Sequence, residues 1–270
     1  MAGAIGLIAG RGELPAIFLQ QAARRGLEVV LVELDGAAVP PGRRGELARL
    51  RVDLAGWPEL VQFFLRHGVR DVYVAGKVSR LQAAALLEQA AAGELAQLYR
   101  RGSHLGDQAL CQLVADELAR VGLRLGEQRE VLADLLMPAG LFSARAPDAR
   151  EARDLERGKV LAQRLAELDV GQTVVLKHGV VLAAEASAEG TDATIRRGGR
   201  LGGPGAVVVK AARPDQDLRL DTPVVGPATV RAMAAVGASC LGVQAGRCFV
   251  LHPQRVRRAA DRAGIAVVGW

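Results

Sequence analysis

Hydrophobic positions in the first half of the chain follow two rhythms. Three segments rich in apolar residues predict strands of a parallel sheet, at residues 4–10, 28–34 and 69–78, and the first is a continuous apolar run typical of a strand buried on both faces. Segments with apolar residues at helical spacing lie between and after them, at residues 16–26, 57–68, 79–101 and 106–122. The order β-α-β-α-β-α-α predicts a doubly wound, Rossmann-like α/β domain.

The second half of the chain has a more mixed pattern. A long charged helix is predicted at residues 147–169, and two short strands within 172–186 turn at the sequence "KHG". A short helix, "ATIRR", follows, and later strands and helices alternate at 205–214, 227–237, 238–246, 247–251, 252–264 and 265–270. We expect a smaller α/β domain with more hairpin character.

Periodicity fades between residues 126 and 146, where proline and glycine interrupt the pattern. We place the domain link there. The predicted organisation is an N-terminal Rossmann-like domain at 1–132, a linker at 133–146 and a C-terminal α/β catalytic domain at 147–270.

Composition indicates a folded, cytoplasmic protein. Half of the residues are hydrophobic, but no apolar run reaches the ~18 residues that cross a bilayer, and the first residues lack the basic region of a signal peptide. The three cysteines show no CxxC spacing, which favours reduced thiols over structural zinc.

The charge of +6 rests mainly on arginine. Only four of the 35 basic residues are lysine, at positions 77, 159, 177 and 210, so each lysine is a candidate for a place that needs a compact ammonium. The excess of positive charge suits an anionic ligand or an acidic membrane surface, although simple solubility explains it equally well.

Two glycine-containing segments in the first domain are candidate anion sites. "GRGELP" places Gly10 and Arg11 between a buried strand and a helix, where backbone N–H groups favour phosphate. It resembles an incomplete dinucleotide fingerprint, with Pro15 at the third glycine position and Glu33 or Asp35 as a ribose ligand. A tight turn without a ligand is the alternative.

The second of these segments is "VAGKVSR", at the end of the third predicted strand. Because ligands bind at the carboxyl ends of parallel strands, its Gly76, Lys77, Ser79 and Arg80 are expected to stand next to the first glycine turn and bind a nucleotide or diphosphate. Alternatively, Ser79 caps a helix and the basic neighbours are solvated.

The acids of the second half form the remaining candidate site. HExxH and GxSxG patterns are absent from the sequence, so zincin and serine hydrolase functions are excluded. Four acids fall at predicted strand ends and suit magnesium: Glu185, Glu189, Asp192 and Asp221. The alternative is that Thr191 or Asp192 caps the helix while the acids pair with Arg196 and Arg197.

Five segments in this order resemble a known enzyme family. They are "GLIAGRGELP", "VAGKVSR", "GDQALCQLVADELARVG", "DVGQTVVLKHGVVLAAEASAEGTDATIRRGG" and "RLDTPVVG". The family is that of the two-domain, magnesium-dependent UDP-2,3-diacylglucosamine pyrophosphatases of the lipid A pathway, which differ from the calcineurin-like phosphoesterases. The segment "KHG" departs from the acidic "EG" that family members often carry.

The resemblance implies hydrolysis of a diphosphate to UMP and 2,3-diacylglucosamine 1-phosphate, assisted by Mg²⁺ or Mn²⁺. It implies that Asp221 is the essential acid and that Glu189, Thr191 and Asp192 belong to the catalytic or metal-binding pocket. Chemistry at a diphosphate also calls for cations, for which Lys210 and Lys77 are the candidates.

The substrate class implies the partners. Two acyl chains need an apolar chamber, for which a cleft between the domains is the expected place, and a lipid substrate requires docking at the inner leaflet. A homo-oligomer is compatible with the sequence, whereas nucleic acid is disfavoured by the few aromatic residues. The rival functions are an NAD(P)-dependent oxidoreductase and a non-catalytic nucleotide- or lipid-binding protein.

Overall fold

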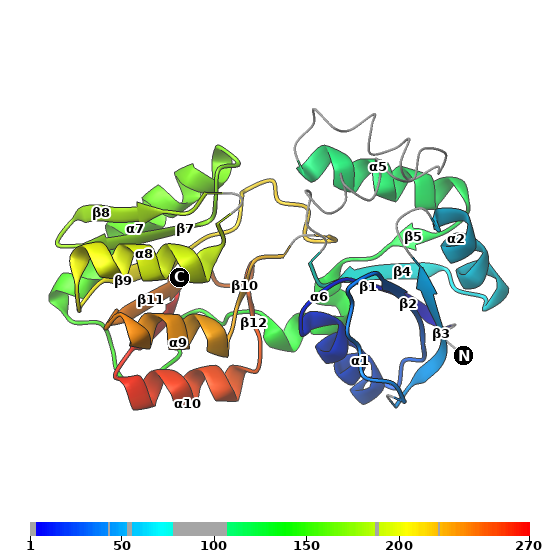
Figure 1. Ribbon diagram of the computed structural model, residues 1–270, viewed down its shortest axis with the longest axis horizontal. Coiled ribbons are helices and arrows are strands. Elements are labelled where there is room, and N and C mark those ends of the chain that lie inside the picture. Colours follow the sequence, from blue (N-terminus) through cyan, green and yellow to red (C-terminus); the bar gives the residue numbers. More distant parts are fainter. Residues whose placement is uncertain (1–3, 43, 53–55, 78–106, 187–188, 221) are drawn as a thin grey trace. The chain divides into compact units, whose positions relative to one another are not determined.

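The computed structural model describes residues 4–42, 44–52, 56–77, 107–186, 189–220 and 222–270. These residues form two compact α/β units (Figure 1). The N-terminal unit contains the described residues up to 133 together with 217–220, and the C-terminal unit contains 134–216 and 222–270. The predicted fold class, a Rossmann-like domain followed by a second α/β domain, is confirmed.

The N-terminal unit is built on a parallel five-stranded sheet of order β3-β2-β1-β4-β5. Its strands are β1 (Ile5–Ala9), β2 (Val29–Leu34), β3 (Glu46–Val52), β4 (Asp71–Ala75) and β5 (Arg124–Leu125). Its helices are α1 (Leu14–Arg24), α2 (Trp57–Arg66), α5 (Asp107–Arg120) and α6 (Gln128–Leu132), the last followed by a 3₁₀ turn, η1 (Ala133–Leu135).

Helices cover both faces of this sheet. Apolar residues of α2 and α5 pack with Val30 and Val72 in one core. On the other face Phe18 of α1 lies against Tyr73, with ring centroids 5.4 Å apart. Because Val72 and Tyr73 are consecutive in β4, they point to opposite faces, which explains why the central strands read as continuous apolar runs.

Strand β3 is an element that the hydrophobic pattern does not predict. It forms the edge of the sheet, and its mixed sequence "ELARLRV" leaves most of its residues partly exposed. An edge strand needs only one buried face, so charged residues such as Arg49 and Arg51 interrupt the apolar run that marks β1 and β2. The short elements β5 and α6, as well as two short strands of the second unit at Gly140–Leu141 and Val224–Val225, are likewise not predicted.

The C-terminal unit has a mixed six-stranded sheet of order β6-β13-β11-β9-β7-β8 and a two-stranded sheet β10-β12. Its strands are β6 (Gly140–Leu141), β7 (Thr173–Lys177), β8 (Val180–Ala184), β9 (Val207–Lys210), β10 (Val224–Val225), β11 (Cys240–Val243), β12 (Phe249–Val250) and β13 (Ala266–Gly269). Its helices are α7 (Ala149–Glu167), α8 (Thr191–Gly202), α9 (Pro227–Ala235) and α10 (Pro253–Ala263).

Alternation along the strands assigns these helices to two layers. Val207 and Val209 of β9 lie in a core with Leu155 of α7. Val208, between them, lies in the other core, with Ile195 of α8 and with residues of α9 and α10. Helix α7 therefore covers one face of the sheet, and α8, α9 and α10 cover the other.

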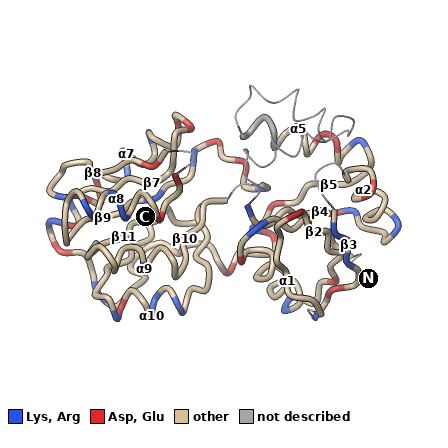
Figure 2. The backbone as a smooth tube through the Cα atoms, viewed as in Figure 1, with Lys and Arg blue, Asp and Glu red and all other residues tan. Residues whose placement is uncertain are grey.

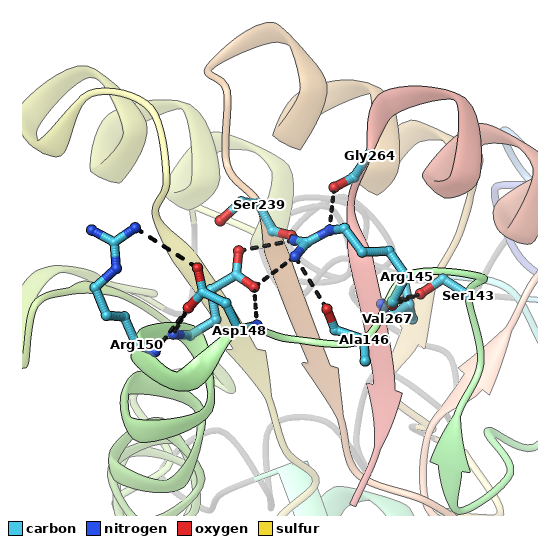
Figure 3. Close-up of polar contacts among 9 residues, drawn as sticks. Ser143, Arg145, Ala146, Asp148, Arg150, Ser239, Gly264 and Val267 are labelled. Atoms are coloured by element: carbon cyan, nitrogen blue, oxygen red, sulfur yellow. Dashed lines mark hydrogen bonds and ion pairs between the residues drawn. The ribbon is translucent and has the colours of Figure 1, made fainter.

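Arg145 fixes the start of α7 to the amino ends of β11 and β13 (Figure 3). Its guanidinium donates to both carboxylate oxygens of Glu151, at 2.8 and 2.9 Å, and to the carbonyl of Gly264 at 2.7 Å. Asp148 caps the same helix by accepting from the backbone N–H groups of Arg150 and Glu151. This network stabilises the edge of the sheet that lies opposite the candidate site described below.

Candidate functional site

Four polar side chains meet at one edge of the C-terminal sheet, and we call them the lysine cluster: Thr173, Glu185, Thr191 and Lys210. Lys210 is the last residue of β9 and lies opposite Thr173, the first residue of antiparallel β7. Glu185 follows β8, and Thr191 is the first residue of α8. Each of the four comes from a different element, so the fold brings them together.

The lysine cluster is connected by hydrogen bonds. The Nζ of Lys210 donates to the hydroxyl oxygen of Thr191 at 2.6 Å, and this hydroxyl donates to Oε1 of Glu185 at 3.3 Å. The hydroxyl oxygens of Thr173 and Thr191 are also 3.3 Å apart. Glu185 Oε2 accepts from the backbone N–H of Gln172. The hydroxyl of Thr191 thus joins a cation and a carboxylate.

The ammonium of Lys210 is the unusual group of this cluster. Lys210 is only 5% exposed, yet it forms no ion pair within the described part of the chain. A buried cation is costly unless an opposite charge compensates it, so this position favours an anionic ligand. The N-terminus of α8 adds a partial positive charge at the same edge.

Asp192 lies beside this cluster in the first turn of α8, and it is partly exposed. Among the described residues its carboxylate has neither an ion pair nor a hydrogen-bond partner. It is therefore available to a ligand or a metal ion.

Glu189 is paired with an arginine, whereas the sequence predicts that it binds a metal ion. Arg197 donates to both of its oxygens, at 2.8 and 2.7 Å, which confirms the alternative pairing of this acid with an arginine. The Arg197 guanidinium lowers the pKa of Glu189 to about 2. Both carboxylate oxygens therefore already have a cationic partner.

Thr191 does not cap α8, so the capping alternative is wrong for this residue. The N-cap is Gly190, with φ of 82°, and no side chain caps the helix. Thr191 already has helical geometry and turns its hydroxyl to Lys210 instead. Glycine is favoured at position 190 because few L-residues adopt this left-handed backbone.

The carboxylates do not by themselves complete a metal site. Within the described ranges, no group of three or more His, Cys, Asp or Glu side chains is placed to hold a metal ion. Asp221 lies outside the described residues. A magnesium ion that keeps several waters and takes phosphate oxygens as ligands needs only one or two carboxylates, which the available Asp192 fits.

The two glycine segments of the N-terminal unit are adjacent, as predicted. The backbone N–H of Arg11 donates to the carbonyl of Lys77 at 3.0 Å, and the reverse bond is 2.8 Å long. Gly76 has φ of 97°, and a Cβ there would lie 2.8 Å from backbone atoms of Gly10 and Arg11. Because Gly76 has no side chain, the two turns can approach each other closely. Arg11 and Lys77 then stand at the carboxyl ends of β1 and β4.

Glu33 is not free to bind a ribose. It is buried, its carboxylate accepts from the backbone N–H of Val39 at 3.2 Å, and it pairs with Arg49 and Arg51 at 3.3 Å. This structural role removes one of the two acids on which the dinucleotide hypothesis depends; Asp35, the other, is exposed. Ser79 and the neighbouring Arg80 lie outside the described residues.

Thr173 is a member of the cluster that the sequence analysis does not identify. Its signal in the sequence is a hydroxyl at the start of the apolar run "TVVL", which has no obvious meaning alone. The register of β7 against β9 is what places it opposite Lys210. Pairing registers of antiparallel strands do not follow from hydrophobic periodicity.

Lys177 and His178 have structural roles at the opposite edge of the sheet. The Nζ of Lys177 donates to the carbonyl of Gly202 at 2.7 Å, which attaches the hairpin to the end of α8. The backbone N–H groups of His178 and Gly179 donate to the buried carboxylate of Asp154. These contacts account for the "KHG" turn.

Comparison with known proteins gives a match along the whole chain. Residues 4–135 match the LpxI N-terminal domain, and residues 138–268 match the LpxI C-terminal domain. The chain is similar to a protein of Caulobacter vibrioides named UDP-2,3-diacylglucosamine pyrophosphatase LpxI, at 31% identity over 273 residues. The alignment covers 98% of this chain and 96% of the relative, so it extends over both units.

Proposed function

The chain belongs to the LpxI family, and from this premise we propose that it hydrolyses the diphosphate bond of UDP-2,3-diacylglucosamine. The products are UMP and 2,3-diacylglucosamine 1-phosphate, an intermediate of lipid A synthesis. The observation that carries the proposal is the similarity to the Caulobacter vibrioides enzyme, which extends over nearly the full length of both chains.

The chemistry of the lysine cluster supports this reaction class. Splitting a diphosphate concentrates negative charge on phosphoryl oxygens and on the leaving group. The buried Lys210 ammonium, held 2.6 Å from the Thr191 hydroxyl, is a preorganised positive charge that is largely shielded from solvent. Phosphate oxygens would supply the anion that Lys210 lacks among the described residues.

The acids have separate roles in the proposed mechanism. Asp192 is the described carboxylate that is available to align water or to hold a cation. Asp221, which the family resemblance implies as the essential acid, is proposed to orient or deprotonate the attacking water. Glu189 is proposed to act only through Arg197, because both of its oxygens are already paired.

Magnesium or manganese is the proposed cofactor. When bound, such an ion neutralises charge on the diphosphate oxygens. Asp192 and Asp221 are the residues that would hold it, with water and substrate completing the coordination. A reaction that stops in excess EDTA and resumes after Mg²⁺ is added back would support this assignment, whereas full activity in EDTA would contradict it.

The glycine turns of the N-terminal unit are proposed to bind an anionic part of the substrate through Arg11 and Lys77. We expect Lys77→Met to raise KM about tenfold with little change in kcat, because a charged contact made equally to the substrate and to the transition state contributes only to binding. Steady-state kinetics with varied substrate measure both constants. A fall in kcat at unchanged KM would instead give Lys77 a role in the chemical step.

Localisation follows from the substrate. We propose that the protein works at the cytoplasmic surface of the inner membrane, because its substrate carries two acyl chains. Within the described part of the chain, no helix is long and apolar enough to cross a bilayer.

The direct test is incubation of the purified protein with UDP-2,3-diacylglucosamine and Mg²⁺, with UMP release as the readout. No UMP above the blank would contradict the proposed function. In ¹⁸O-labelled water, the label appears either in UMP or in the lipid phosphate and so identifies the phosphorus attacked. A parallel titration with NADH tests the oxidoreductase alternative.

A further inference from the structure

Helix α10 presents a strongly basic surface. Four of its eleven residues are exposed arginines: Arg255, Arg257, Arg258 and Arg262. Val256 and Ala260 are buried in the core below the helix, which fixes its rotation and turns the arginines away from the sheet. Figure 2 shows these basic positions as blue segments along α10.

Three of the arginines form a continuous stripe. Arg255, Arg258 and Arg262 are separated by three and four residues, so they lie on one side of the helix. No arginine of α10 forms an ion pair within the ranges that the structure describes. The one acid of the helix is Asp261, whose carboxylate accepts from the backbone N–H of Ala144. The positive charge of the stripe is therefore not neutralised by the described residues.

The neighbouring helices of the same layer extend this basic surface. Arg231 of α9 and Arg196 and Arg200 of α8 are exposed and likewise have no ion pair among the described residues. Helix α9 packs between α8 and α10, so the three helices share one side of the sheet. We call the exposed arginines of these helices the arginine face.

Helix α7, on the opposite side of the sheet, has a different arrangement of charge. Its basic residues include Lys159, paired with Glu156 at 2.5 Å, and Arg164, paired with Glu167 at 2.8 Å. Arg153 and Arg157 have no ion pair among the described residues, but α7 carries four acids beside its five basic residues, whereas α10 carries one acid beside four arginines. Positive charge is therefore mixed with negative charge on one side of the sheet and concentrated on the other. An overall excess of arginine in the sequence does not explain this asymmetry.

We propose that the arginine face docks on an anionic lipid bilayer. The choice of partner rests on the proposed function, because a diacylated substrate is held in a membrane. Like charges on adjacent helices repel one another, and an anionic surface relieves this repulsion. Each arginine near such a surface strengthens binding roughly fivefold. Because the apolar side of α10 is buried in the protein core, the attachment is electrostatic and reversible.

The composition of the face favours a membrane over nucleic acid. Helices α8, α9 and α10 contain no aromatic residue, so the face lacks the stacking groups that single-stranded nucleic acids use. Salt screens the attraction between exposed charges, so docking should weaken as ionic strength rises and should depend on the lipid composition.

The experiment compares two triple variants with equal net charge. Arg255→Gln, Arg258→Gln and Arg262→Gln remove the stripe, and Arg153→Gln, Arg157→Gln and Arg164→Gln remove three exposed arginines of α7. Sedimentation with phosphatidylcholine vesicles, with and without phosphatidylglycerol, measures binding without substrate. We expect the stripe variant to bind anionic vesicles on the order of 100-fold more weakly, and the α7 variant to bind nearly as the parent does.

The outcomes separate docking from catalysis. Hydrolysis of substrate dispersed in neutral detergent should be the same for both variants and the parent, so a failure of the proposed function would appear in the parent itself. Arg→Lys changes at the three stripe positions should retain vesicle binding, because they keep the charge. Equal losses in both Gln variants, no preference of the parent for anionic vesicles, or binding to oligonucleotides but not vesicles would overturn the proposal.

Discussion

Lys210 is the residue on which the proposed chemistry of the C-terminal unit depends most. Its aliphatic stem lies at the end of a fully buried strand, and its ammonium is held by the hydroxyl of Thr191. Burying an ammonium without a paired carboxylate costs stability. A protein that retains such a group gains something else from it, and we propose that the gain is a positive charge that binds a diphosphate.

We expect Lys210→Met to lower kcat/KM about 100- to 1000-fold, because the variant loses a preorganised charge that stabilises the transition state. The thermal midpoint should be unchanged or higher, since an apolar side chain of similar length replaces a desolvated cation. Activity assays and thermal unfolding on the same preparations measure both effects.

Lys177→Met is the matched control for this prediction. Lys177 belongs to the same sheet but bonds to the carbonyl of Gly202 at the opposite edge, so its loss should leave the chemistry intact. Comparable losses of activity in both variants would show that lysine removal acts through the fold and not through the site.

At the scale of elements, Glu130 connects α6 to β4 and β5. Its carboxylate accepts from the Tyr73 hydroxyl at 2.7 Å and from Arg124 at 3.1 Å. The bonds from Arg124, followed by that from Tyr73, lower the pKa of Glu130 from 4.5 to about 2. The protonated carboxyl would lose most of this interaction.

The free energy of unfolding should therefore depend on pH through the protonation of Glu130. The folded pKa lies below the unfolded one, so the contribution is fully present above pH 4.5 and is lost as the pH falls toward 2. Arg124 and Glu130 are partly exposed, which limits the effect to roughly 1 kcal/mol. Chemical denaturation between pH 2 and 7 should show a flatter pH profile for Glu130→Gln than for the parent. An identical slope in both proteins would contradict this assignment.

Helix α8 depends on glycine for its position. A Cβ at Gly199 would lie 2.3 Å from the side chain of Val236, and one at Gly198 would lie 2.7 Å from that of Val175. Small residues therefore let α8 approach both the sheet and α9 closely. This approach places Thr191, at the start of the helix, within reach of Lys210.

We expect Gly199→Ala to destabilise the protein by about 1–3 kcal/mol, because the added methyl group overlaps with Val236. The second change Val236→Ala should recover much of the loss, which a double-mutant cycle by urea unfolding measures. Additive destabilisation by the two substitutions would mean that this contact does not limit the packing of α8.

The sequence predicts elements better than it predicts contacts between them. Strands β1 and β2 are buried on both faces, so their apolar runs identify them directly. Strand β3 escapes detection because one of its faces is solvated. Lys210, Thr191 and Asp192 can be selected by residue type and position, but the contribution of Thr173 depends on strand register. The pairing of Glu189 with Arg197 depends on how the loop before α8 folds back on the helix.

At the scale of the whole molecule, the two structural units are not consecutive stretches of the chain. After β9 the chain leaves the C-terminal unit, and residues 217–220 belong to the N-terminal unit before the chain returns at Thr222. Leu220 packs against the N-terminal core formed with α2 and α5. The carbonyl of Leu220 accepts from the buried side chain of Gln128 at 3.4 Å.

The sequence pattern suggests two consecutive domains because it does not reveal this excursion. Hydrophobic periodicity is a local property, whereas the association of residues 217–220 with α6 spans more than eighty positions. Gln128 makes the connection twice, because its amide also donates to the carbonyl of Val74 at 2.8 Å, near the end of β4. The family's proposed essential acid, Asp221, follows directly in the sequence.

We expect Leu220→Ser to loosen the N-terminal unit although the residue lies in the second half of the sequence. The change removes an apolar side chain from that core and should cost about 1–2 kcal/mol. Hydrogen exchange measured by mass spectrometry should accelerate in β4 and α2 and remain unchanged in β11 and β13. The exposed Leu168→Ser, in the loop after α7, serves as the control and should alter neither set. Faster exchange confined to β11 and β13 would contradict the assignment of residues 217–220 to the N-terminal unit, because the elements that loosen are those packed against Leu220.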